Sequence, residues 1–154
     1  MRAVAQRVTA ASVAVAGEVT ARIGCGLCVF VAAGGGDGAA DVAHLADKLA
    51  HLRVFPATGP QAGPGRMTRS LRDGGGELLL VPQFTLYGDV RRGRRPDFTG
   101  AAAPAEGRRL LGELAAALRA HGLTVQEGVF GAEMEVLVRN DGPVTILLDS
   151  ARTF

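Results

Sequence analysis

Side chains that commonly carry acid–base, nucleophilic or metal chemistry are sparse in this sequence and lie far apart. The three histidines, His44, His51 and His121, fall in segments with helical periodicity, and none is close in sequence to a candidate serine, threonine or cysteine. A Ser-His-Asp set could still assemble in space, but helix-surface histidines more often serve as solvated or capping residues. His44 and His51 are too far apart for the i, i+4 pair of a zinc helix. We therefore expect neither a metal site nor a cofactor.

Cysteines and carboxylates offer little more. Cys25 and Cys28 form a C-x-x-C pair, but a second pair for zinc is missing, and the pair lies in a glycine-punctuated strand rather than at a helix start. Asp89, Asp97 and Asp141 stand in polar, loop-like contexts that solvent exposure explains. An enzyme built on this chain must therefore use its backbone for much of the chemistry.

A glycine-rich stretch raises the possibility of nucleotide binding. Gly34, Gly36 and Ala39 fit the G-x-G-x-x-G/A spacing that cradles a pyrophosphate between a strand and a helix. No acidic residue follows at the end of a strand about 20 residues on to hold a ribose. A nucleotide-dependent enzyme using the loop at residues 34–38 remains an alternative.

Two short segments combine few ionisable side chains with unusual backbone features. The first, "VPQFTLYGD" at residues 81–89, carries Pro82 within an apolar strand pattern, and proline cannot donate to a strand ladder. The second, "NDGPVT" at residues 140–145, joins strong turn dipeptides to an apolar run, which is typical of a tight turn that opens a strand.

Four arginines gather in "VRRGRRPDF": Arg91, Arg92, Arg94 and Arg95. The formal net charge of +2 does not imply a general polyanion-binding surface. A solvated loop explains such a run, yet a guanidinium binds phosphate bidentately, so the cluster also suits a nucleic-acid backbone.

The periodicity of the chain predicts an α+β fold with a mostly antiparallel, barrel-like sheet and two main helices. We expect helices at 41–52, capped by Asp37 or Asp41, and at 104–120, with a proline-rich loop at 56–66. The expected strands cover residues 2–8, 12–23 with a turn at 16–17, 27–32, 77–87, 124–127, 135–139 and 144–148.

Length and composition suit one domain over residues 1–154, of which 47% are hydrophobic. No apolar run approaches the roughly 18 residues needed to span a bilayer, and the N-terminus lacks the continuous apolar region of a signal peptide. We therefore expect a cytoplasmic protein without membrane partners.

At the two segments the sequence resembles the D-aminoacyl-tRNA deacylases, which free tRNA from D-amino acids. Their signatures, Ser-Gln-Phe-Thr-Leu and Asn-x-Gly-Pro-x-Thr, match residues 82–86, with Pro82 in place of serine, and residues 140–145, which include Asn140 and Thr145. Further likenesses are "MRAVAQRV", "RRGRRPDFT" and "GVFGAEMEV". The resemblance implies a hydrolase acting on tRNA charged with a D-amino acid or glycine. Pro82 removes any role for a hydroxyl at that position.

The resemblance also implies roles for individual residues. Main-chain groups around Gln83, Phe84 and Thr85 position the ester and stabilise the oxyanion, with help from the 2′-hydroxyl of the terminal adenosine. Gly142 and Pro143, joined by a cis bond, reach across a homodimer interface and exclude L-amino acids.

Several of these residues have plainer alternatives. Thr85 is the plausible side-chain nucleophile of its segment. The alternative is that it is simply a β-branched residue of a strand, with no role in catalysis. Phe130 and Met134 shape an adenosine pocket or belong to the core. Arg7 braces the Gly-Pro turn or lies on a strand surface. A non-catalytic RNA-binding module that uses the arginine cluster is the rival function.

Overall fold

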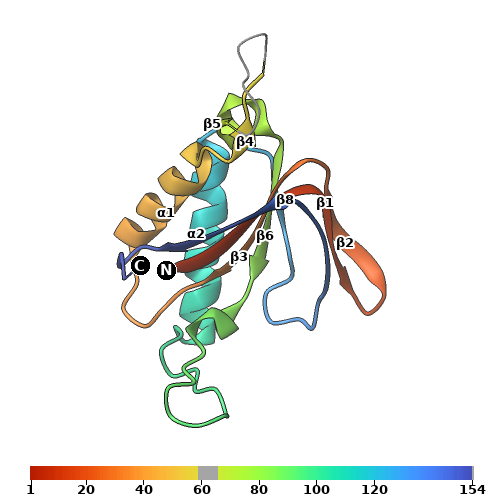
Figure 1. Cartoon of the computed structure of the whole chain (residues 1–154). Coiled ribbons are helices and arrows are strands. Elements are labelled where there is room, and N and C mark those ends of the chain that lie inside the picture. The colour runs from red at the N-terminus through yellow and green to blue at the C-terminus, as the bar shows by residue number, and fades with distance from the viewer. Residues whose placement is uncertain (59–65, 154) are drawn as a thin grey trace.

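The strand β1 (Arg2–Val15) organises the sheet in the computed structural model, which describes residues 1–58 and 66–153. One edge of β1 pairs with β3 (Gly26–Ala32) and then with β2 (Glu18–Ile23), and the other edge pairs with β8 (Glu135–Asp149). All three pairings are antiparallel. A single strand therefore links both ends of the sequence within one sheet (Figure 1).

The sheet continues from β3 through two parallel neighbours, β6 (Glu77–Pro82) and β7 (Val125–Glu127). A small antiparallel pair, β4 (Phe55–Pro56) with β5 (Met67–Arg69), lies apart from it. Most pairings are antiparallel and the main sheet curls into a nearly closed form, so the predicted α+β, barrel-like class is confirmed (Figure 1).

Two helices, α1 (Ala39–His51) and α2 (Pro104–Ala120), pack side by side on one face of the sheet (Figure 1). Their leucine stripes meet inward-facing residues of β3 and β6, including Leu27 and Leu78. The opposite faces of the same strands carry Cys28, Leu79 and Val81, which form a second buried cluster. Because β3 and β6 are covered on both faces, the sequences of these strands are nearly continuous apolar runs.

Several element boundaries differ from the sequence expectation. Strand β1 runs unbroken through residues 9–11, and residues 135–149 form one strand rather than two. Gly38, not Asp37 or Asp41, is the N-cap of α1, and the Asp41 carboxylate accepts the Gly38 N–H at 2.9 Å. The expected loop at 56–66 lies largely outside the described residues.

The largest correction concerns residues 83–87, which we expected in a strand. β6 ends at Pro82, and Phe84–Tyr87 form a one-turn 3₁₀ helix, η2. Proline has no N–H to continue the ladder, so the chain leaves the sheet there. A second short helical turn, η1 (Leu71–Gly75), precedes β6. Within the described ranges, no helix is both long and apolar enough to cross a membrane.

Two substitutions on α2 should change stability in opposite directions. Leu110 is fully buried, so Leu110→Ala should lower the free energy of unfolding by about 2–5 kcal/mol. Gly112 lies on the exposed face, and a Cβ there meets nothing within 4 Å. Gly112→Ala should therefore raise stability by about 0.5–1 kcal/mol through helix propensity. Urea denaturation measures both, and a destabilising Gly112→Ala would contradict the placement of that face.

Candidate active site

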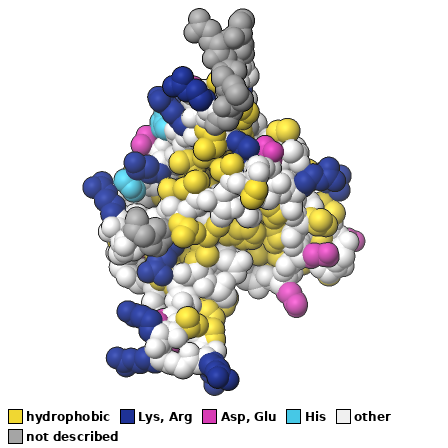
Figure 2. Space-filling view, in the orientation of Figure 1, with side chains coloured by type: hydrophobic (Ala, Val, Ile, Leu, Met, Phe, Trp, Pro, Cys, Tyr) yellow, Lys and Arg dark blue, Asp and Glu magenta, His cyan; other side chains and the backbone are white. Residues whose placement is uncertain are grey.

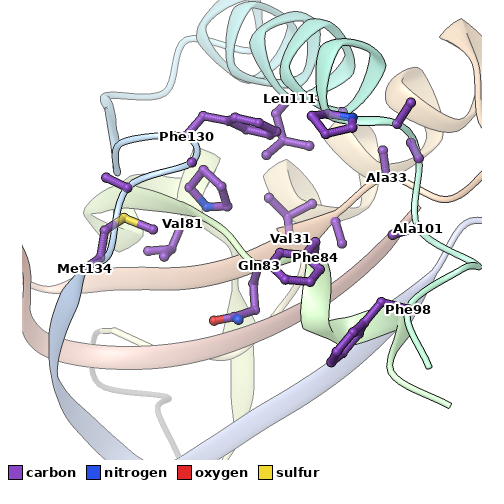
Figure 3. Close-up of a pocket in the computed structure, with 18 of the residues that line it drawn as sticks. Val31, Ala33, Val81, Gln83, Phe84, Phe98, Ala101, Leu111, Phe130 and Met134 are labelled. Carbon is purple, nitrogen blue, oxygen red and sulfur yellow. The ribbon is translucent and has the colours of Figure 1, made fainter. Parts of the chain in front are cut away.

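A cavity of about 710 Å³ opens where β6, the start of α2 and the segment before β8 meet. This volume lies within the roughly 300–1,000 Å³ common for ligand pockets. Its walls are mostly apolar (Figure 3). The lining comes from Val31–Ala33, Val81–Phe84, Phe98, Ala101–Pro104, Gly107, Leu111, Phe130–Ala132, Met134 and Val136.

Backbone groups of η2 border this cavity. Gln83 N–H donates to the Val31 carbonyl at 2.8 Å, which ties the turn to β3. The first bond of the turn is donated by Leu86 N–H to the Gln83 carbonyl at 3.2 Å. The N–H groups of Phe84 and Thr85 precede that bond, so the helical pattern leaves them free to bind an anionic oxygen.

Thr85 is an exposed residue of η2, so its interpretation as a strand residue is wrong. The side-chain amide of Gln83 donates a hydrogen bond to the Thr85 hydroxyl oxygen. An amide is not a base, and a threonine nucleophile needs one. This contact orients the hydroxyl without activating it.

The far end of η2 is anchored by Tyr87. Its hydroxyl donates to Asp37 Oδ2 at 3.3 Å, and the Arg2 guanidinium lies 4.5 Å above its ring. Arg2 also donates to the Leu86 carbonyl at 3.2 Å. Burial, with the nearby Asp37 carboxylate, raises the pKa of the Tyr87 hydroxyl, which therefore stays a neutral donor.

Gly34 gives the Tyr87 ring its space. A Cβ added at Gly34 would lie 2.5 Å from the tyrosine hydroxyl oxygen. Asp37 Oδ2 accepts the Gly34 N–H at 2.5 Å as well, so the carboxylate joins the glycine loop to the tyrosine. The loop that suggested pyrophosphate binding thus has a structural role in supporting η2.

Phe130 and Met134 both lie on the cavity wall (Figure 3). The Phe130 ring rests against Gly107 of α2, and the Arg108 guanidinium lies 4.8 Å from its centroid. Arg108 also donates to the Phe130 carbonyl at 3.3 Å. Met134 Sδ accepts the Val129 N–H at 3.3 Å. These contacts fix the orientation of two side chains that face the cavity.

The second signature forms a large bulge in β8. Residues 141–144 stand opposite the single residue Arg7, between the pairs Val8–Asn140 and Gln6–Thr145. The Gly142–Pro143 peptide bond is cis, and both residues are exposed. The bulge therefore projects from the sheet.

Side chains on both strands hold this bulge. Arg7 donates to the Val54 carbonyl at 2.6 Å, and its Nε lies 2.9 Å from Asp141 Oδ2. Asn140 Oδ1 accepts the Val144 N–H at 3.2 Å, and the Thr145 hydroxyl accepts the Gln6 amide at 3.2 Å. Arg7 is thus no plain surface arginine.

Apart from the four arginines, the predicted site residues fall into two groups within one chain. The first group meets at the cavity and contains Gln83, Phe84, Phe130 and Met134, with Thr85 beside it. The second group surrounds the β8 bulge and contains Arg7, Asn140, Gly142, Pro143 and Thr145, none of which lines that cavity.

The four arginines lie in an exposed loop whose ends, Asp89 and Asp97, pair through reciprocal backbone hydrogen bonds of 2.7 and 2.9 Å. The Arg91 side chain is largely exposed, and its guanidinium donates hydrogen bonds to the Asp89 carboxylate through Nε and Nη2. Hydrogen bonds from Arg91 lower the pKa of Asp89 to about 2, so the pair stays ionised at neutral pH.

Other chemistry finds little support in the described parts of the chain, where no three His, Cys, Asp or Glu side chains gather as a metal site. The pKa of the buried Cys28 thiol is raised to about 12 by desolvation, so it stays protonated. Sequence reasoning missed Arg2, Asp37 and Tyr87 as supports of the site. Their partners are too distant in sequence for a local pattern to indicate them.

Comparison with known proteins gives a consistent result. The family model described as D-Tyr-tRNA(Tyr) deacylase matches residues 4–149. A D-aminoacyl-tRNA deacylase from Desulfitobacterium hafniense is 52% identical over 154 residues and covers 100% of both chains. One from Deinococcus radiodurans is 52% identical over 149 residues, covering 97% of this chain and 99% of its own.

Two solved structures share the fold. The c-Myc DNA Unwinding Element Binding Protein has a TM-score of 0.87 and 38% identity, covering 97% of this chain and 98% of its own. A structure described as a probable eukaryotic D-amino acid tRNA deacylase has a TM-score of 0.80, with coverage of 96% and 97%. At 20% identity, the second shows the fold alone.

Two neighbouring glycines provide a matched test of the η2 anchor. Gly34→Ala should displace the Tyr87 ring, whereas a Cβ at Gly35 meets nothing within 4 Å. Hydrogen exchange of the Leu86 and Gly88 amides, which bond within the turn, should accelerate about tenfold or more in Gly34→Ala. Gly35→Ala should exchange like the wild type. Equal exchange in both variants would show that Tyr87 does not hold the turn.

Proposed function

The chain belongs to the D-Tyr-tRNA(Tyr) deacylase family, a family of hydrolases, and we propose that it cleaves the ester of both D-aminoacyl-tRNA and glycyl-tRNA while sparing L-aminoacyl-tRNA. The observation that carries this proposal is the 3₁₀ turn η2, which begins at Phe84 on the wall of an apolar cavity and leaves its first N–H groups without partners in the turn. Such donors stabilise an oxyanion strongly where water is excluded. The enzyme meets its substrate in the cytoplasm.

In the proposed reaction, the ester carbonyl lies against the N–H groups of Phe84 and Thr85. Water supplies the oxygen that stays with the amino acid, and the 3′-oxygen of the terminal adenosine leaves with a proton. The adjacent 2′-hydroxyl of the same ribose is the group that relays this proton or activates the attack. It fills a role for which the described cavity walls provide no histidine or carboxylate.

The adenosine itself fits between Phe130 and Met134. An aromatic ring and a polarisable thioether suit the flat face of a base. Both side chains are held by contacts outside the cavity, so binding requires little reordering. The loop from Asp89 to Asp97, which we call the arginine loop, would then contact the nucleic-acid backbone.

Discrimination between D- and L-residues is proposed to come from a second copy of the chain. Gly142 and Pro143 are exposed, are braced by Arg7, and lie outside the cavity of their own chain. In a C₂ homodimer, the bulge of each subunit enters the cavity of the other. A rigid backbone wedge there excludes an L-side chain without needing to recognise a D-side chain.

The exposed character of β8 supports such a dimer. β8 pairs with β1 on one edge, and no strand in the described residues covers the other. Leu137 and Leu147 of this strand are also exposed. Exposed strand edges and apolar side chains are typical of a surface that pairs with another chain. The rival of a non-catalytic RNA-binding module uses the arginine loop alone and leaves the bulge unexplained.

A matched deacylation assay tests the proposed activity. The same tRNA charged with D-alanine, glycine or L-alanine should lose the first two residues rapidly and keep the third, because glycine offers no side chain for a wedge to exclude. Glycyl-tRNA as resistant as L-alanyl-tRNA would mean that a D-side chain is recognised directly. No turnover of any of the three would favour the binding module.

A second assay separates the protein hydroxyl from that of the substrate. Thr85→Ala should remain active and lose no more than about tenfold in rate, a rise of about 1.4 kcal/mol in the barrier, because only positioning suffers. A D-aminoacyl-tRNA ending in 2′-deoxyadenosine should be almost inert with the wild type. An inactive Thr85→Ala that still binds substrate, together with normal cleavage of the deoxy substrate, would assign the nucleophile to the protein.

A further inference from the structure

A second hollow, of about 810 Å³, adjoins the cavity at Phe98, which lines both. It lies within the arginine loop, and we call it the arginine hollow. Figure 2 shows basic side chains around this projecting loop with apolar atoms between them. The arginine hollow is lined by Asp89, Arg91, Arg92, Arg95, Pro96, Asp97 and Phe98.

The arginines of this hollow are not equivalent. The positive charge of Arg91 is balanced by the Asp89 carboxylate, which accepts hydrogen bonds from Arg91 Nε and Nη2. Arg92 and Arg95 form no salt bridge with any residue of the described ranges. Two guanidinium groups therefore remain available for an external anion at the hollow.

An aromatic surface stands beside these charges. The Phe98 ring packs edge to face on Phe84, with centroids 5.2 Å apart, and both rings are partly open to solvent (Figure 3). Phe98 is 37% exposed and Phe84 is 61% exposed. Single-stranded RNA is commonly bound by stacking its bases on such rings while arginines hold its phosphates.

We propose that the arginine hollow is a subsite for the nucleotide that precedes the terminal adenosine. Arg92 and Arg95 bind the phosphate on the 5′ side of that adenosine, and the preceding base stacks on Phe98. The proposal rests on the proposed function, which puts the adenosine in the adjoining cavity. The single-stranded 3′ end of the tRNA then crosses Phe98 as it leaves the cavity.

Three uncleavable probes separate the two parts of this subsite. In each probe, D-phenylalanine is joined to the 3′ position of the adenosine by an amide bond. The first probe contains adenosine alone, the second adenosine 5′-phosphate and the third cytidylyl-(3′→5′)-adenosine. Calorimetry should show tighter binding by about tenfold when the phosphate is added, and by about tenfold again when the cytidine is added.

Matched variants assign each gain to its residues. Arg92→Gln with Arg95→Gln should abolish the gain from the phosphate, whereas Arg94→Gln should preserve it, because Arg94 does not line the hollow. Phe98→Leu should abolish the gain from the cytidine, whereas Phe98→Tyr should retain it. These ratios compare probes within one variant, so a general loss of stability leaves them unchanged.

The possible failures are distinguishable. If wild-type affinity is the same for all three probes, or if Arg94→Gln weakens the phosphate gain as much as the double variant, the subsite is wrong. Cleavage of D-aminoacyl-tRNA in that case leaves the proposed function intact. If D-aminoacyl-tRNA is not cleaved and the adenosine probe does not bind, the proposed function itself fails, and the subsite with it.

Discussion

The close approach of Tyr87 to Gly34 is the contact on which the site depends. The tyrosine ring occupies the space of a missing side chain, and Asp37 and Arg2 hold it from two sides. This ring holds the end of η2, while the hydrogen bond from Gln83 N–H to the Val31 carbonyl holds its start. A site that works through its backbone needs such support, since a main-chain donor cannot reorient by changing a rotamer.

β1 connects the two groups of functional residues. Its Arg2 contacts η2, while its Arg7 braces the β8 bulge. Both arginines therefore extend from one strand of a continuous sheet. In the proposed dimer, β1 would therefore support both the cavity of its own subunit and the β8 bulge that enters the partner's cavity. Selectivity would then depend on backbone positions more than on side-chain identity.

The sequence predicted elements with strong periodicity and missed contacts between distant residues. Both helices and the turn at Ala16–Gly17 were evident, because apolar spacing and glycine act locally. Pro82 indicated an interruption of the strand, but the strand was still expected to continue through residues 83–87, whereas β6 ends at Pro82. The grouping around the cavity came from family resemblance. The Tyr87 anchor could not be predicted, since its partners Arg2 and Asp37 are brought near it only by folding.

A mixed dimer tests the central claim, that the wedge of one subunit completes the cavity of the other. One subunit carries Arg7→Gln, which loosens its bulge, and its partner carries Gly107→Leu, which fills the cavity beside Phe130. The Arg7→Gln homodimer should cleave L-alanyl-tRNA, and the Gly107→Leu homodimer should be inactive. In the mixed dimer, the open cavity faces an intact bulge, so D-alanyl-tRNA should be cleaved and L-alanyl-tRNA spared. The account would be contradicted if the mixed dimer cleaved L-alanyl-tRNA as fast, per open cavity, as the Arg7→Gln homodimer does.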